Sequence, residues 1–160
     1  MGFNIAGIIV NKNYDNKIEE LGNSLGLNLI FEKEITYEGA TGNWKDDGIC
    51  DIYFAENGTF LYLPFDMCAT ESYAIENQDV LTFAYSETSM AFTFDYFENG
   101  NFRRKIFEAE GERIYERGEP LPEEALHTEV SELIFDKIGT VLGQRFWDID
   151  FNAKAFRYKI

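Results

Sequence analysis

Residues 94–118, FDYFENGNFRRKIFEAEGERIYERG, decide the fold because two turn signals divide them into three short runs of strand-forming residues. Asn99-Gly100 is a pair favoured in two-residue type I′ hairpin turns, since both positions of such a turn need a positive φ. Glu110-Gly111 provides a second turn of the same length. The stretch therefore predicts three antiparallel strands joined by two tight hairpins.

The two turns also predict which residues face each other. The first turn places Asp95 opposite Arg104, and the second places Lys105 opposite Glu116. The basic triplet Arg103, Arg104 and Lys105 then has acidic neighbours on both sides. Exposed cross-strand pairs contribute only about 0.2 to 1 kcal/mol each, so these pairs select the register more than they stabilise the fold.

The same register leaves one arrangement that a structural role does not explain. It places Arg104 beside Arg117, with Asp95 as the only obvious counter-ion. Two guanidinium groups on neighbouring strands can hold a second carboxylate. Arg104 and Arg117 are therefore a candidate anion site for a ligand or for an acidic residue of a partner.

The remaining sequence predicts more strands and two principal helices. Residues 3–10 form an apolar strand, and residues 14–25 carry a helical stripe of apolar side chains. Asn57-Gly58 predicts another two-residue turn, and the segment after Pro122 has apolar residues at helical spacing as far as Gly143. We expect one α+β domain over residues 1–160: a mainly antiparallel twisted sheet with an N-terminal helix and a long C-terminal helix packed on it.

Composition favours a compact acidic protein. Of the 160 residues 45% are hydrophobic, and the formal net charge is −15. This charge opposes binding to nucleic acid or to an anionic membrane and attracts basic partners, although it can also serve solubility alone. Cys50 and Cys68 do not suggest a disulfide framework, and the start of the chain has neither a signal-peptide pattern nor a span long enough to cross a membrane. We expect a cytoplasmic protein with reduced cysteines.

Catalytic and metal motifs are weak. His127 is the only histidine, so no serine or cysteine triad can be assigned. DIDFN at 148–152 begins like a calcium loop, but Ala153 and Lys159 stand where that loop needs glycine and glutamate. No phosphate-binding glycine loop is present. The sequence therefore predicts no metal and no cofactor.

Trp44, Asp46 and Asp47 lie in a glycine-containing segment without periodicity, YEGATGNWKDDG at 37–48. A large aromatic side chain surrounded by acids on a loop is typical of an anchor in a protein interface. We therefore predict that these three residues bind a partner. The alternative is that Trp44 folds back as a lid on the core.

The segments FDYFENGNFRRKI and EGERIYERGEPLPEEA resemble small uncharacterised bacterial α/β domains found among the immunity proteins of polymorphic toxins. The resemblance covers roughly residues 79–143 and supplies no catalytic residues. It implies a non-enzymatic binding protein that neutralises a basic toxin, or another basic protein, by covering its surface. A carboxylate-based hydrolase and a small-ligand-binding or structural module are the alternatives.

Overall fold

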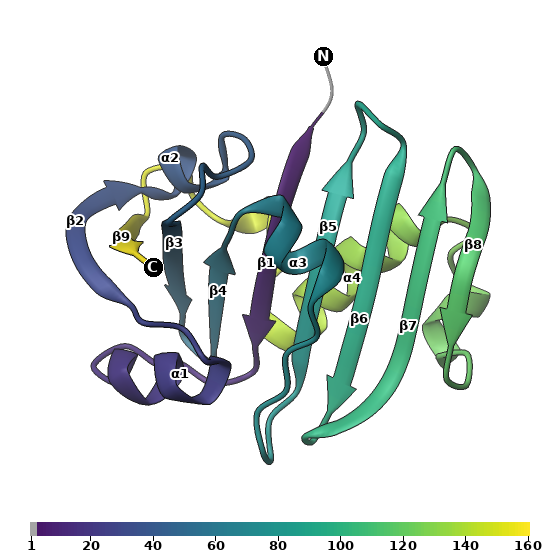
Figure 1. The fold of residues 1–160 in the computed structure, drawn as a ribbon, viewed down its shortest axis with the longest axis horizontal. Coiled ribbons are helices and arrows are strands. Elements are labelled where there is room, and N and C mark those ends of the chain that lie inside the picture. Colours follow the sequence, from purple (N-terminus) through teal and green to yellow (C-terminus); the bar gives the residue numbers. More distant parts are fainter. Residues whose placement is uncertain (1–2) are drawn as a thin grey trace.

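The computed structural model describes residues 3–160 and contains a single open sheet of nine strands (Figure 1). The strands are β1 Asn4–Val10, β2 Ile30–Thr36, β3 Ile49–Ala55, β4 Gly58–Tyr62, β5 Val80–Ser86, β6 Ala91–Glu98, β7 Asn101–Ala109, β8 Glu112–Arg117 and β9 Lys154–Lys159. Their order across the sheet is β2-β9-β3-β4-β1-β5-β6-β7-β8, and every neighbouring pair is antiparallel. The prediction of a mainly antiparallel sheet is therefore confirmed.

Helices cover both faces of the sheet. They are α1 Ile18–Leu25, α2 Tyr37–Thr41, α3 Phe65–Thr70 and α4 Val130–Leu142, with 3₁₀ turns at Pro122–Ala125 and Phe146–Asp148. In Figure 1 α3 lies in front of the sheet and α4 lies behind it. Buried side chains of α1 and α3 form one apolar core, and those of α2 and α4 form another. We call the two sides the α3 face and the α4 face.

Strand burial follows this layering. β1 lies in the middle of the sheet and its sequence, NIAGIIV, is apolar at almost every position, because both of its faces are covered. β8 lies at the edge and is exposed at all six positions, and its sequence, ERIYER, is mostly charged. α3 contacts β1 and β5, and no helix lies in front of β7 and β8 in Figure 1. Part of the α3 face is therefore open.

The turn between β3 and β4 differs from the predicted one. Ala55 pairs with Gly58, so the turn residues are Glu56 and Asn57 instead of Asn57 and Gly58. A Cβ atom on Gly58 would lie 2.5 Å from the carbonyl oxygen of Leu142 at the end of α4. Glycine is needed here for close packing and not for a positive φ. The register moves by two residues, which leaves each side chain on its expected face.

The two turns within residues 94–118 lie where the sequence predicts them. Asn99 and Gly100 have φ of 51° and 82°, and Glu110 and Gly111 have φ of 52° and 81°. The predicted register of the strands is nevertheless wrong beyond each turn, because β7 and β8 each contain a β-bulge. A bulge inserts one unpaired residue and moves every later side chain to the other face.

The first bulge changes the neighbours of the basic triplet. Tyr96 pairs with Arg104, and Asp95 pairs with Lys105. Arg103 is the extra residue between Phe102 and Arg104. The predicted facing of Asp95 and Arg104 is therefore incorrect: Arg104 lies on the α4 face, and Lys105 lies on the α3 face with Asp95.

The segment after Pro120 begins its long helix later than expected. Residues 122–125 form a 3₁₀ turn, and α4 begins only at Val130 and ends at Leu142 before Gly143, whose φ is 79°. Residues 146–148 form a second 3₁₀ turn. Within residues 3–160, every helix is too short or too polar to cross a membrane.

Candidate functional site

Arg104 has its carboxylate partner within the chain. The side chain is only 1% exposed, and its Nε and Nη2 atoms donate to Glu124 Oε2 and Oε1 at 2.9 and 2.8 Å. Further bonds reach Glu116 Oε1 at 3.1 Å and the Gly118 carbonyl at 3.0 Å. These acceptors use the donors that an external anion would need, so Arg104 stabilises the junction between β7 and the 3₁₀ turn.

Arg104 and Glu124 each stabilise the charged form of the other. Hydrogen bonding to Glu124 raises the pKa of Arg104 above its usual value, against the effect of burial. Burial alone would raise the pKa of Glu124, but hydrogen bonds from Arg104 and from the Leu121 amide outweigh it, so that pKa is lowered. Both groups are therefore ionised at neutral pH.

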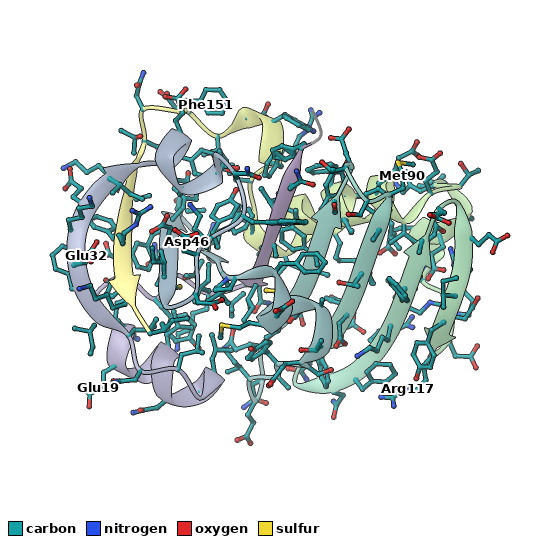
Figure 2. The ribbon with its side chains drawn as sticks, turned by 45° about the horizontal axis from the view of Figure 1, so that its top comes forward. Glu19, Glu32, Asp46, Met90, Arg117 and Phe151 are labelled. Atoms are coloured by element: carbon teal, nitrogen blue, oxygen red, sulfur yellow. The ribbon has the colours of Figure 1, made fainter. Side chains whose placement is uncertain are left out.

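Arg117 points to the opposite face from the Arg104 side chain. Its guanidinium carbon lies 4.2 Å from the centre of the Phe102 ring, a cation–π contact on the α3 face of the edge strand β8 (Figure 2). The only contact between the two arginines runs from Arg104 Nη1 to the Arg117 carbonyl, at 3.5 Å. The structure therefore does not bring the two guanidinium groups of the candidate anion site together.

Trp44 lies beside α3. Its ring centre is 4.7 Å from that of Phe65, and 38% of the residue is exposed. Asp46 and Asp47, which follow it, are exposed. Lys45, which lies between Trp44 and Asp46 in the sequence, reaches the buried carboxylate of Asp51 at 2.8 Å. This ion pair fixes the loop to β3. The three predicted partner-binding residues therefore lie on one anchored surface loop.

An apolar groove of about 490 Å³ lies next to Trp44, and we call it the Trp44 groove. Most of its lining is apolar or aromatic and comes from α3 on one side and from strands β6, β7 and β8 on the other. The lining includes Trp44, Phe65, Cys68, Ala69, Thr93, Asp95, Lys105, Phe107 and Tyr115. Sequence reasoning found the Trp44 side of this groove and missed the strand side.

Asp95 is a buried acid in this otherwise apolar lining. It is only 4% exposed. Ser72 Oγ donates to its Oδ2 at 2.5 Å, and Lys105 Nζ lies 3.4 Å from the same oxygen. Its other oxygen, Oδ1, has no hydrogen-bond partner among residues 3–160, and neither has Oγ1 of Thr82, which faces Asp95 from β5. The carboxylate oxygen only accepts hydrogen bonds, so the Asp95 side of the groove fits a group rich in donors, whereas the Thr82 hydroxyl can also donate and Thr82 lies outside the lining.

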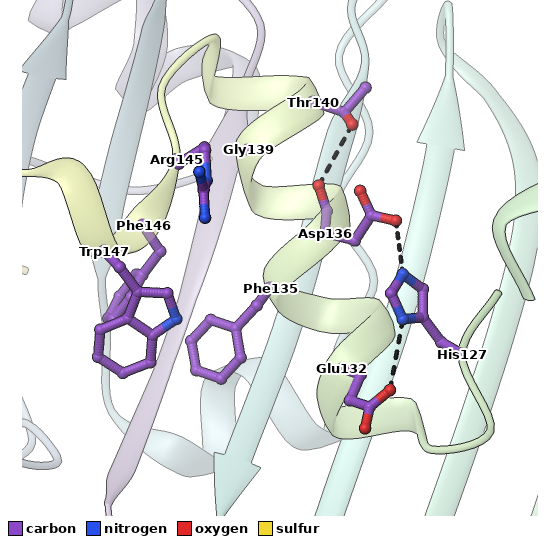
Figure 3. A pocket seen from close by; sticks show the side chains of 9 residues that line it. All are labelled: His127, Glu132, Phe135, Asp136, Gly139, Thr140, Arg145, Phe146 and Trp147. Atoms are coloured by element: carbon purple, nitrogen blue, oxygen red, sulfur yellow. Dashed lines mark hydrogen bonds and ion pairs between the residues drawn. The ribbon is translucent and has the colours of Figure 1, made fainter.

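A second cavity, of about 600 Å³, lies along the outer side of α4 (Figure 3). One of its sides is aromatic, with Phe135, Phe146 and Trp147, and His127 lies on the other. His127 Nε2 lies 2.8 Å from Asp136 Oδ2, and Nδ1 lies 3.4 Å from Glu132 Oε2. Because α4 places Glu132 and Asp136 one turn apart, both carboxylates reach the same ring.

This arrangement favours the protonated form of His127. The hydrogen bond to Asp136 is the main reason that the pKa of His127 is raised, and the contact with Glu132 adds to it. A ring with a carboxylate at each nitrogen donates through both and has no free lone pair to accept a proton. His127 is thus suited to fastening the segment before α4 and poorly suited to act as a general base.

Other reactive groups in the described part of the chain include two buried thiols and two ion-paired carboxylates. Burial raises the pKa of the thiols of Cys50 and Cys68, which makes both poor nucleophiles. The carboxylic acids with a resolved pKa shift, Glu123 and Glu124, are shifted downward, whereas a catalytic acid needs a raised value. Residues 3–160 contain no group of three or more His, Cys, Asp or Glu placed to hold a metal ion.

Comparison of the chain with protein-family models, with curated proteins and with solved structures gives no match. Function is therefore inferred from the Trp44 groove, its charges and its exposed rings alone.

Proposed function

We propose that the protein is a non-enzymatic, acidic binding protein whose partner is a basic protein held at the Trp44 groove. The observation that carries this proposal is Asp95, a buried carboxylate in the lining of the apolar Trp44 groove, whose Oδ1 has no hydrogen-bond partner among residues 3–160. An ammonium or guanidinium group has donors and no acceptor, so it suits a carboxylate that has an oxygen without a donor. Lys105 and Ser72 reach only Oδ2, and a buried carboxylate oxygen without a donor is unfavourable, which favours a partner's cation at this place.

The net charge of the protein and the exposed rings at the groove also favour binding of such a partner. The net charge of −15 accelerates the encounter with a cationic protein, and the exposed Asp46 and Asp47 place part of that charge on the loop that carries Trp44. The exposed rings of Trp44 and Tyr115 offer the aromatic anchor area that dominates many interfaces. Lys105 limits the site to one added cation, because it already neutralises part of the Asp95 charge.

A protein that covers a cationic surface in this way can neutralise a toxin without any chemistry, so we extend the proposal to an immunity protein of the cytoplasm. Two observations support this. Cys50 and Cys68 are unpaired and buried, as is usual where thiols stay reduced. The lowered pKa values of Glu123 and Glu124 and the raised pKa of His127 give no support to the alternative of a carboxylate-based hydrolase.

The test uses a fluorescein-labelled peptide of alternating arginine and leucine residues, followed by anisotropy. We expect binding that weakens steeply as salt rises from about 50 to about 500 mM, because the Debye length falls well below 10 Å over that range. A peptide with glutamine in place of arginine should not bind measurably.

Three single variants locate the site. Asp95→Asn and Trp44→Ala should each weaken binding of the arginine peptide about tenfold or more, because they remove the charge and the ring anchor. Trp147→Ala removes an exposed tryptophan from the α4 face and should have no effect. Equal losses from Trp44→Ala and Trp147→Ala would place binding elsewhere. Binding of the glutamine peptide that does not respond to salt would favour the small-ligand module instead.

A further inference from the structure

Strand β8 forms an open edge of the sheet. It is the last strand in the order, and among the described strands it pairs only with β7. Ile114 and Tyr115, at its centre, are 56% and 44% exposed. An exposed edge presents unpaired backbone groups that can pair with another strand.

The sequence of β8, ERIYER, is complementary to itself when it runs antiparallel. Pairing about the centre of the strand places Glu112 opposite Arg117 of a second copy, and Arg113 opposite Glu116. The two apolar residues, Ile114 and Tyr115, then face each other. Opposite charges and apolar pairs are the combinations that stabilise neighbouring strands.

The backbone of β8 is arranged for the same register. Glu112 pairs with Ala109 next to a two-residue turn, so its amide and carbonyl groups point toward β7 and those of Arg113 point outward. Beyond the bulge at Ile114 the alternation resumes one residue later, which turns the backbone groups of Glu116 outward. The residues with outward backbone groups are therefore Arg113 and Glu116, and self-pairing places these two opposite each other.

The other edge of the sheet does not have this property. β2, Ile30–Thr36, is also exposed along most of its length. β2 has a bulge at Glu32, and antiparallel self-pairing about its centre would place Lys33 opposite Lys33. Like charges facing each other are one way in which proteins prevent edge-to-edge association. The two edges thus differ in the feature that decides whether a second copy is accepted.

We infer that the protein forms a two-fold homodimer in which β8 of one copy pairs antiparallel with β8 of the other, so that one sheet continues through both molecules. The contact is small, and each copy carries a net charge of −15, so association is weak. A dissociation constant of about 100 µM is in keeping with a contact of this size. The inference rests on β8 alone and is independent of the Trp44 groove.

The experiment is sedimentation equilibrium at physiological salt over a concentration series up to about 1 mM. The wild-type protein should change from monomer to dimer across the series. Glu112→Lys should weaken the dimer about tenfold or more, because it places a lysine opposite Arg117 in both symmetry-related pairs. Glu110→Lys is the matched control, with the same change of net charge in the adjoining turn, and it should not weaken the dimer.

A mixture of two variants decides the register. Arg117→Glu alone should also lose the dimer, since it faces Glu112 of the second copy. An equimolar mixture of Glu112→Lys and Arg117→Glu restores opposite charges in both pairs, and it should associate at least as well as the wild type. Circular dichroism on each variant checks that the fold is kept. A wild-type protein that stays monomeric throughout, or a mixture that stays monomeric, would overturn the inference.

Discussion

The buried pair of Arg104 and Glu124 gives the most quantitative prediction. Substituting Glu124→Gln keeps the size of the side chain but leaves the guanidinium of Arg104, which is 1% exposed, without its two-pronged partner. Removing one partner of a buried ion pair destabilises proteins by about 3 to 5 kcal/mol, because the other charge stays buried without its partner. Glu116 still contacts the same guanidinium, and glutamine still accepts one hydrogen bond, so we expect a loss of about 2 to 3 kcal/mol.

Equilibrium unfolding in urea at neutral pH, followed by tryptophan fluorescence, measures this loss. Glu116→Gln is the matched control, because Glu116 also bonds Arg104 but is about half exposed, and it should lose less than about 1 kcal/mol. Equal losses in the two variants would refute the reasoning, since exposure would then not decide the strength of the pair. A loss below about 1 kcal/mol for Glu124→Gln would do the same.

The pH dependence of unfolding provides a second measurement on the same pair. The pKa of Glu124 is lower in the folded protein than its usual value, so its stabilising effect is complete above the unfolded pKa of about 4.3. The effect is lost as the pH falls from there through the folded pKa. Stability of the wild type should therefore fall more steeply in acid than that of Glu124→Gln, and parallel curves would contradict the assignment.

Three further outcomes follow from other parts of the fold. Gly58→Ala should lower the free energy of unfolding by about 1 to 3 kcal/mol, because the added Cβ meets the Leu142 carbonyl, and thermal melts will show whether it does. His127 has a raised pKa in the folded protein, so its contribution is complete below the unfolded pKa of about 6.5 and is lost as the pH rises through the folded value. An NMR titration of its ring should give a midpoint above about 6.5, and one at or below this value would show that Asp136 does not hold the proton. Cys50 and Cys68 should both react with a thiol reagent only after unfolding, and rapid labelling of the native protein would show that they are accessible.

The two turns within residues 94–118 could be predicted from the sequence, and the register beyond them could not. Asn99-Gly100 acts locally, because the chain must have a positive φ at both positions whatever it packs against. Gly58 follows an asparagine in the same way, but it is needed to let the end of α4 approach, and no neighbouring residue signals this. A glycine has two physical reasons to be in a strand turn, and only the tertiary contact distinguishes them.

Only the Trp44 side of the candidate site could be predicted from the sequence, because the strand side depends on tertiary structure. Trp44 with its acidic neighbours was recognisable as an aromatic residue in an irregular, charged segment, and the structure places it at a groove. The strand side required the positions of the bulges. One local signal was present, because Asp95 interrupts a run of aromatic residues, and a charge at such a place is either paired or used for binding.

The bulge at Arg103 connects the fold with the proposed site. In the unbulged register Asp95 would face Arg104, whose forked guanidinium could satisfy both carboxylate oxygens. The inserted residue sends Arg104 to the α4 face, where Glu124 satisfies it, and brings Lys105 to Asp95 instead. An ammonium group binds as a point charge, and Lys105 contacts only Oδ2. The one-residue shift that completes the buried arginine pair therefore also leaves the second oxygen of Asp95 without a partner at the groove.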